Sequence, residues 1–291
     1  MKLSTELLFE KLQTEFTITA YRNLSSADGF LRPFLYDSKP LIDSRPIYEP
    51  LDKSKGITPG HVCLAHGKRL EEFIPHIFEE HFLVLTGTRG DVQKLSSAVF
   101  PYVVLSENTS LSSVLNFLQD IFDFYDDWSN ELNTFLLKND DITLLLHNAL
   151  KIFQNPLSVI SVDFSLIAET GEEKIPEKSR IFSDKEPNID YINALTQDET
   201  YQSFCNSPTP FFFPGYITGI STLTMNIFQN GVPTHRLILY EAQKPITRGE
   251  YCLLSHLAGY VEYLLYHQHI PISGQANDLH RILQTTLSDR S

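Results

Sequence analysis

The stretch LSSVLNFLQDIFDFYDDWSNELNTF, residues 111–135, decides how the rest of the chain is interpreted. Its apolar residues recur at alternating steps of three and four, the a/d pattern of a helix with one apolar seam. The seam consists of Leu111, Val114, Leu118, Ile121, Tyr125, Trp128, Leu132 and Phe135. Because such a seam needs a partner helix, the pattern predicts a homodimer. The predicted interface residues are Leu111, Leu118, Ile121, Tyr125, Trp128 and Leu132.

Aspartates lie between the seam positions of this helix. Asp120, Asp123 and Asp127 fall at i, i+3 and i+7 and therefore share one helical stripe. To bind a metal, carboxylates on a single helix need ligands from a second element. The spacing favours a solvated face, with contact to a basic partner surface as the alternative.

Composition narrows the class of protein. A chain of 291 residues with 42% hydrophobic and 20% charged residues is long enough for two domains with apolar cores. Its net charge of -13, from 23 basic and 36 acidic residues, argues against direct binding to DNA. We expect a cytoplasmic protein without a membrane partner, because no apolar run could span a bilayer and no secretion signal opens the chain.

The first part of the chain alternates between strand and helix patterns. Strands are predicted at 61–65, 81–86 and 102–105, separated by helices at 70–80 and 91–98, and a first helix is capped by Ser4. A short edge strand is predicted at 42–48. This order indicates a small parallel sheet in an α/β domain that covers residues 1–107.

The second part follows a different order. Linker helices are predicted over 108–155, ending at Asn155-Pro156. A sensor domain of α+β class follows over 156–272, of the PAS or GAF kind, and 273–291 begins another helix. The predicted elements of the sensor domain are strands at 157–163 and 166–170, a polar mobile loop at 174–188, a helix at 189–205, a hairpin at 220–241 around Gln229-Asn230-Gly231, and a helix at 248–267.

Four stretches resemble the sensory half of PucR/CdaR-type bacterial transcription regulators. They are the opening MKLS, the segments FLQDIFDFYDDWSNEL and NPLSVISVDFSLIAETG, and RLILYEAQKPITRGEYCLLSHLAGYVEYLL. The resemblance implies an N-terminal domain, a linker helix, a GAF-like domain and a C-terminal helix-turn-helix domain that binds DNA. Residues 273–291 are too short for that last domain, so we expect DNA to be a partner only through a domain absent from this chain.

The densest aromatic cluster is the candidate ligand site. Phe211, Phe212 and Phe213 precede Pro214-Gly215-Tyr216, and three consecutive residues of a strand cannot all face one core. Small-molecule sites are apolar and aromatic with a few polar groups. We therefore predict a pocket for a small-molecule effector, with a ligand-free core lid as the alternative. The predicted ligand-binding residues are Tyr191, Phe212, Tyr216, Thr222 and Arg236.

Metal and catalytic motifs are weak. His76 and His81 are five residues apart and cannot share an ion from one helix, and His267 and His269 have no ligand cluster nearby. Cys63, Cys205 and Cys252 form no CxxC motif and are expected to be reduced, with Cys63 and Cys252 buried. We predict no metal and no cofactor.

One glycine-rich turn invites a phosphate interpretation. Gly87-Thr88-Arg89-Gly90 follows a strand but lacks the Walker GK[ST] sequence. A tight strand-to-helix turn is favoured, and an anion beside Arg89 at the next helix N-terminus is the alternative.

These observations predict the effector-sensing and dimerising region of a transcription regulator. The chain is not expected to be an enzyme, because no complete nucleophile and base set is present. Two alternatives remain: an interaction scaffold with a degenerate GAF-like pocket, and an enzyme that uses the N-terminal α/β domain.

Overall fold

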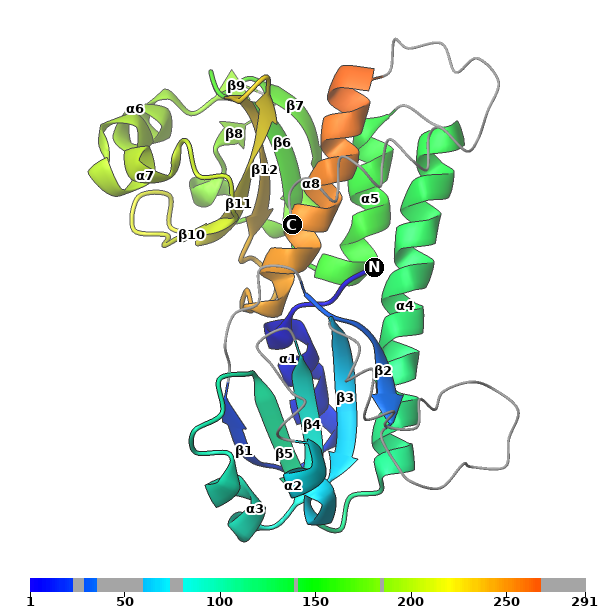
Figure 1. Ribbon diagram of the computed structural model, residues 1–291. Helices are drawn as coiled ribbons and strands as arrows, with labels where there is room; N and C mark the ends of the chain where they lie inside the picture. The colour runs from blue at the N-terminus through cyan, green and yellow to red at the C-terminus, as the bar shows by residue number, and fades with distance from the viewer. Residues whose placement is uncertain (23–28, 36–59, 74–80, 139–140, 184–185, 268–291) are drawn as a thin grey trace. The chain divides into compact units, whose positions relative to one another are not determined.

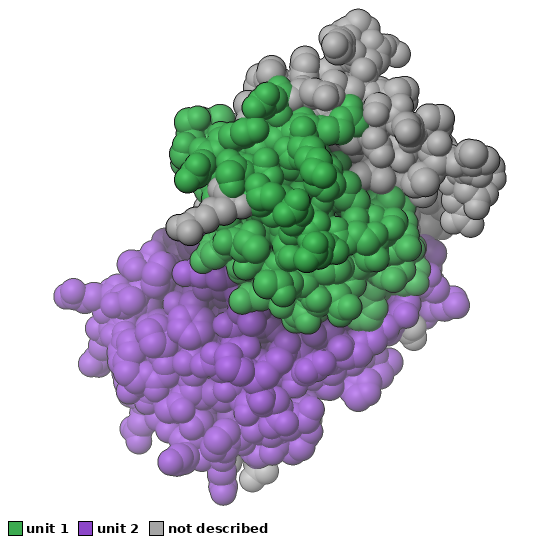
Figure 2. Space-filling model, turned by 90° about the horizontal axis from the view of Figure 1, so that it is seen from below, with its two compact units in different colours: residues 1–130 green, residues 131–291 purple. Residues whose placement is uncertain are grey.

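A computed structural model describes residues 1–22, 29–35, 60–73, 81–138, 141–183 and 186–267. The chain divides into two compact units, Met1–Asn130 and Glu131–Ser291, which Figure 2 distinguishes. The boundary lies inside the long helix α4 (Leu111–Lys138), within the stretch predicted as linker helices.

Unit 1 is built on a five-stranded sheet in the order β1-β5-β4-β3-β2 (Figure 1). Strands β2 to β5 are parallel, and β1 pairs antiparallel with β5. Besides the start of α4, its elements are α1 (Thr5–Glu15), β1 (Ile18–Arg22), β2 (Leu31–Leu35), β3 (His61–His66), α2 (Leu70–Phe73), β4 (Phe82–Gly87), α3 (Arg89–Lys94) and β5 (Tyr102–Ser106).

Sequence patterns explain the centre of this sheet. The β4 sequence FLVLTG is buried at every position, as expected for a central parallel strand covered on both faces. The predicted strands at β3, β4 and β5 are confirmed, and Ser4 caps α1 by accepting a hydrogen bond from the Leu7 N–H. The edge strands β1 and β2 were not predicted. The strand predicted at 42–48 and most of the helix predicted at 70–80 lie outside the described residues.

The apolar seam of α4 is covered within the single chain. Trp128 is 1% exposed, Leu111 is partly buried, and the remaining predicted interface residues are buried: Leu118, Ile121, Tyr125 and Leu132. The helix is confirmed, but a second copy of the chain is not needed to shield its seam. The homodimer stays a prediction.

The aspartate stripe of α4 is solvent-exposed as predicted, and one of its members, Asp123, also pairs with a basic residue. Arg32 of β2 pairs with Asp123 at 2.6 Å and with Asp126 at 2.7 Å. Asp120 and Asp127 are exposed. The basic partner of Asp123 is therefore a residue of unit 1 itself.

Unit 2 is an antiparallel α+β unit whose sheet has the order β10-β11-β12-β6-β7. Besides the end of α4, its elements are α5 (Ile142–Phe153), β6 (Leu157–Ser161), β7 (Leu166–Thr170), β8 (Phe182–Ser183), β9 (Glu186–Pro187), α6 (Ile189–Gln197), α7 (Glu199–Phe204), β10 (Phe211–Phe213), β11 (Thr222–Gln229), β12 (Val232–Tyr240) and α8 (Gly249–His267).

Helices cover both faces of this sheet (Figure 1). Helices α5 and α8 pack on one face, and α6 and α7 lie over the other. The β11–β12 hairpin turns at Asn230 and Gly231, whose φ angles are 52° and 79°, so the predicted Asn-Gly turn is confirmed.

Two predictions for unit 2 were wrong. The helix predicted over 189–205 is broken into α6 and α7 at Asp198, whose carboxylate accepts a hydrogen bond from the Tyr201 N–H at 2.7 Å and caps α7. The segment 174–188, predicted as a mobile polar loop, contains the β8–β9 hairpin, and its apolar residues Ile175, Ile181 and Phe182 are buried.

Candidate functional site

The candidate site lies on the sheet face of unit 2 that is turned toward α6 and α7, which we call the inner face. On β12, residues 236, 238 and 240 point to this face, because Ile238 and Tyr240 pack with Leu195 and Tyr201 of the two helices. Residues paired directly across strands share a face. The inner face therefore carries six buried polar residues: Ser158, Thr222, Thr224, Asn226, Arg236 and Tyr240.

The opposite face of the same strands is mostly apolar, with the half-buried His235 of β12 as an exception. Between the polar positions of β11 lie Leu223, Met225 and Ile227, and β12 contributes Leu237 and Leu239. Burying polar groups is unfavourable unless they have hydrogen-bonding partners. The inner face thus combines an apolar cluster, which includes Ile160, Phe213 and Ile238, with buried polar groups, and an apolar lining with a few polar groups is typical of small-molecule sites.

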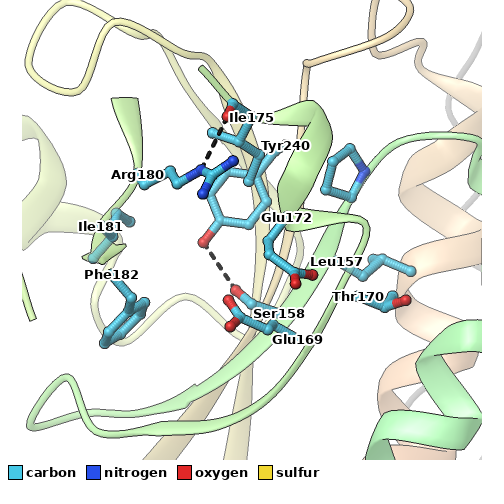
Figure 3. Close-up of a pocket in the computed structure, with 11 residues that line it drawn as sticks. Leu157, Ser158, Glu169, Thr170, Glu172, Ile175, Arg180, Ile181, Phe182 and Tyr240 are labelled. Carbon is cyan, nitrogen blue, oxygen red and sulfur yellow. Dashed lines mark hydrogen bonds between the residues drawn. The ribbon is translucent and has the colours of Figure 1, made fainter. Parts of the chain in front are cut away.

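A cavity of about 240 Å³ opens at the Tyr240 end of the inner face (Figure 3). It lies between strands β6, β7 and β12 and the segment 172–182. The residues that line it are Pro156, Leu157, Ser158, Glu169, Thr170, Glu172, Ile175, Arg180, Ile181, Phe182 and Tyr240.

Hydrogen bonds hold the polar groups of this cavity in place. The hydroxyls of Ser158 and Tyr240 share a hydrogen bond of 2.9 Å, and burial raises the pKa of the Tyr240 phenol, so it stays neutral. Arg180 donates from Nε to the Ile175 carbonyl at 3.1 Å, and its side chain reaches toward Tyr240 (Figure 3). Glu169 and Glu172 add carboxylates to the lining, so the site offers groups of both charges and neutral hydroxyls.

A second polar group of the inner face is Arg236. Its guanidinium carbon lies 5.4 Å from the Phe164 ring centre and 5.5 Å from that of Tyr201. Its Nη2 donates to the Cys205 sulfur at 3.7 Å. Burial raises the pKa of the Tyr201 phenol, although the charge of Arg236 opposes this shift.

Of the five predicted ligand-binding residues, the structure brings two together on the inner face, Thr222 and Arg236. Tyr191 donates its hydroxyl hydrogen bond to the Lys178 carbonyl. Tyr216 donates to Asp198 Oδ2 at 2.8 Å and is 59% exposed. Both hydroxyls therefore donate to groups within unit 2. None of the five residues, all within the described part, lines the cavity.

The alternation predicted for the three phenylalanines is present in β10. Phe211 and Phe213 are buried, and Phe212 is 36% exposed. Phe212 pairs with Leu223 and therefore points to the face opposite to the inner face. Its position gives no support to its assignment to the ligand site.

The prediction missed Ser158, Asn226, Tyr240 and Arg180. A signal existed for two of them: Thr222, Thr224 and Asn226 alternate with apolar residues in β11, and Tyr240 follows Arg236 by four residues in β12. Arg180 carried no signal, because it lies in a polar segment without periodicity.

The glycine-rich turn of unit 1 is not an open anion site. Asp91 Oδ2 accepts hydrogen bonds from the Thr88 N–H and hydroxyl, both at 2.8 Å, which forms a capping box for α3. These donors lower the pKa of the Asp91 carboxyl against the opposing effect of burial. The tight turn is confirmed, and the carboxylate of Asp91 occupies the place considered for an external anion; the Arg89 side chain lies outside the described part.

The histidine and cysteine predictions can be placed as well. Within the described ranges, no group of three histidine, cysteine, aspartate or glutamate residues is arranged to hold a metal. His81 is fully buried, whereas His76, His269 and the side chain of His267 lie outside what the structure describes. Cys63 is buried as predicted, but Cys252, which was also predicted to be buried, is only half-buried, as is Cys205. The three cysteines form no disulfide.

Among the helices of the described residues, none combines the length and the apolar character needed to cross a bilayer.

Comparisons with known proteins give matches among solved structures only. No family model matches the chain, and no curated protein matches it. Among solved structures, the GAF domain of an Acinetobacter phosphoenolpyruvate-protein phosphotransferase is similar, with 9% sequence identity and a TM-score of 0.38. That match covers 53% of this chain and 98% of the GAF domain.

Proposed function

We propose that unit 2 is a GAF-like sensor domain that binds a small polar metabolite in the cavity beside Tyr240. The observation that carries the proposal is the buried polar inner face that ends in this cavity. The sheet order supports it, because the last strand, β12, lies between β11 and β6 with helices on both faces, as in the predicted α+β sensor class.

The cavity adjoins a junction that could transmit binding to the helices of unit 2. Pro156 lines the cavity, and its neighbour Asn155 is fully buried. The Asn155 Oδ1 accepts hydrogen bonds from the Gln243 N–H at 2.8 Å and the Lys244 N–H at 3.2 Å, and its Nδ2 donates to the Lys244 carbonyl at 2.9 Å. This clamp joins the end of α5 to the segment that leads into α8.

Helix α4 is coupled to the same helices inside unit 2. Glu131 pairs with Lys151 of α5, and Asn133 accepts a hydrogen bond from the Tyr260 hydroxyl of α8 at 3.0 Å. A ligand that favours one arrangement of the Asn155 clamp would thus change the packing of α5 and α8 against α4. Such a ligand acts as a signal only if it binds two arrangements with different affinity.

In this proposal the chain is the effector-sensing region of a PucR/CdaR-type transcription regulator. It acts as a homodimer, and a helix-turn-helix domain outside this sequence contacts DNA. No catalytic step is assigned to either unit. Sedimentation of the full chain with and without ligand tests the dimer, and a monomer under both conditions contradicts that part.

Ligand binding is tested by thermal denaturation of the full chain against purines, sugar acids, amino acids and nucleotides. A ligand that binds the native state raises the melting temperature in a saturable way. Arg180→Met should remove the response by deleting the guanidinium of the cavity. Arg248→Met is the matched control, because Arg248 is exposed and stacks on Tyr251 of α8. Silence across all four ligand classes would favour the scaffold with a degenerate pocket.

A further inference from the structure

Arg236 is a buried cation in the middle of the inner face. It is 5% exposed, and no carboxylate of the described residues forms an ion pair with it. An isolated charge in a protein interior is costly unless it is paired. The position therefore calls for a counter-charge.

The groups around Arg236 orient its guanidinium without neutralising it. The rings of Phe164 and Tyr201 provide cation–π contacts, and the Cys205 sulfur accepts from Nη2. The Nε and Nη1 nitrogens are buried and have no hydrogen-bond partner among the described residues. Two nitrogens of a charged group, with three N–H donors between them, are thus held in place and left unused.

An acceptor without a partner lies on the neighbouring strand, directly opposite Arg236. Asn226 is fully buried and pairs with Arg236 in the β11–β12 register. Its Nδ2 donates to the carbonyls of Phe204 at 2.9 Å and Ser207 at 3.0 Å, which fixes the orientation of the amide. Its Oδ1 has no hydrogen-bond partner within the described part of the chain.

We propose that Arg236 and Asn226 form a second ligand site, for a small molecule with an oxyanion group, carboxylate or phosphate, next to a hydrogen-bond donor. The oxyanion accepts from Arg236, and the donor binds Asn226 Oδ1. The site is distinct from the cavity beside Tyr240, because four residues of a strand separate Arg236 from Tyr240, roughly 13 Å. Tyr201 of α7 and the adjacent Cys205 cover the guanidinium, so entry requires α7 to move off the sheet.

The test measures thermal denaturation of the full chain in inorganic phosphate, in sodium acetate and in sodium chloride at equal ionic strength. Phosphate or acetate, whichever matches the site, should raise the melting temperature saturably above the chloride value. Arg236→Met should weaken this binding about tenfold or more, since charge-assisted hydrogen bonds are lost. In chloride alone, this variant should melt at the same or a higher temperature than the parent, because Met fills the site without a buried charge.

Arg180→Met is the control that separates this site from the cavity. It should keep the phosphate or acetate response while losing the metabolite response of the proposed function. The inference is overturned if neither anion acts beyond chloride, or if Arg236→Met keeps the response. It is also overturned if Arg236→Met melts clearly lower in chloride, which would make the cation–π contacts structural.

Cys205 supplies the last discriminating measurement. If its thiolate were the counter-ion of Arg236, the thiol would react with an alkylating reagent as a thiolate near neutral pH, and Arg236→Met would slow that reaction. That result overturns the inference. Equal, slow alkylation in both proteins is expected, with Cys205→Ser as the blank.

Discussion

The two sheets of this protein are buried to a similar degree but with different chemistry. In unit 1, the buried residues of the central strands β3, β4 and β5 are apolar, except for Thr86 of β4. In unit 2, six buried polar residues share the inner face. The two buried faces therefore differ in composition, because the inner face adds polar groups to its apolar cluster.

The same contrast holds for buried or capped charges. Asp91 of unit 1 has its hydrogen bonds supplied by Thr88, so its charge stabilises a helix start. Arg236 of unit 2 keeps two donor nitrogens, Nε and Nη1, without a partner in the described residues. A charge whose partners are present serves the fold, whereas one with unused donors points to a ligand.

The largest expected effect lies in the apolar core of unit 1. Leu83→Ala should lower the free energy of unfolding of unit 1 by about 2–5 kcal/mol, because Leu83 is fully buried and the site cannot collapse completely. Hydrogen exchange of unit 1 amides measures the change locally. Val99→Ala, at a position 56% exposed, should change it by less than about 0.5 kcal/mol. Equal losses would show that the sheet is not a packed core.

The next effect separates structural polar groups from ligand groups in unit 2. Asn155→Ala should cost about 2–3 kcal/mol, since it leaves two N–H groups and one carbonyl without their partner. Chemical denaturation followed by circular dichroism reports the loss. The exposed Asn193 of α6 provides the control, Asn193→Ala. A loss under about 0.5 kcal/mol would mean that the clamp does not hold the junction.

Two opposite substitutions, one in each sheet, test whether the buried faces of the two units differ in their tolerance of polar groups. Val84→Thr in β4 should cost about 1–3 kcal/mol, because it adds a hydroxyl to a fully buried apolar strand. Thr224→Val on the inner face replaces a hydroxyl with a methyl group, and the side chain keeps its shape. This change should leave the free energy of unfolding unchanged within about 1 kcal/mol, or raise it. Thermal denaturation of both variants gives the pair of values. Similar losses in both would make the polar inner face structural.

A smaller effect is expected at the cavity. Tyr240→Phe removes one partner of the buried Ser158–Tyr240 hydrogen bond and should cost about 1 kcal/mol. Ligand affinity should fall as well, which isothermal titration measures with any ligand found by the thermal screen. Tyr21→Phe, at a position 59% exposed, is the control and should alter neither quantity. A stability loss with unchanged affinity would place the hydroxyl outside the ligand contact.

The smallest effect depends on pH and belongs to Asp91. The folded-state pKa of this carboxyl is lowered, so its stabilisation is present above the unfolded-state pKa of about 4 and disappears as pH falls through the folded-state value. Asp91→Asn should therefore cost about 1 kcal/mol at neutral pH and progressively less under acid conditions. Denaturant titrations at several pH values test this. A difference independent of pH would contradict the role of its charge.

Much of the fold was predictable because its signals are local. The 28-residue helix α4 follows from a period of three and four, the β11–β12 turn from Asn230-Gly231, and the α5 start from the Asp141 side chain. The break between α6 and α7 was missed, because the capping role of Asp198 is hidden in a pattern that continues across it. Edge strand β1 was missed because it is short and mostly exposed.

The site was predictable only in part. Thr222 and Arg236 were among the predicted residues, but Ser158 and Tyr240 are separated by 82 positions and share a hydrogen bond only after β6 pairs with β12. Arg180 reaches the same cavity from an aperiodic segment. No local pattern records such contacts, because they depend on strand order.

By itself, the sequence determined the long helix α4, the central strands of unit 1 and the β11–β12 turn, since periodicity, caps and turn residues act over a few positions. Only the tertiary structure decided that Trp128 is covered within one chain and that the polar residues of three strands meet on one buried face. It also decided that a cavity lies at one end of this face. The physical reason is that burial and pairing arise between segments distant in sequence, and their outcome is set by the packing of the whole unit.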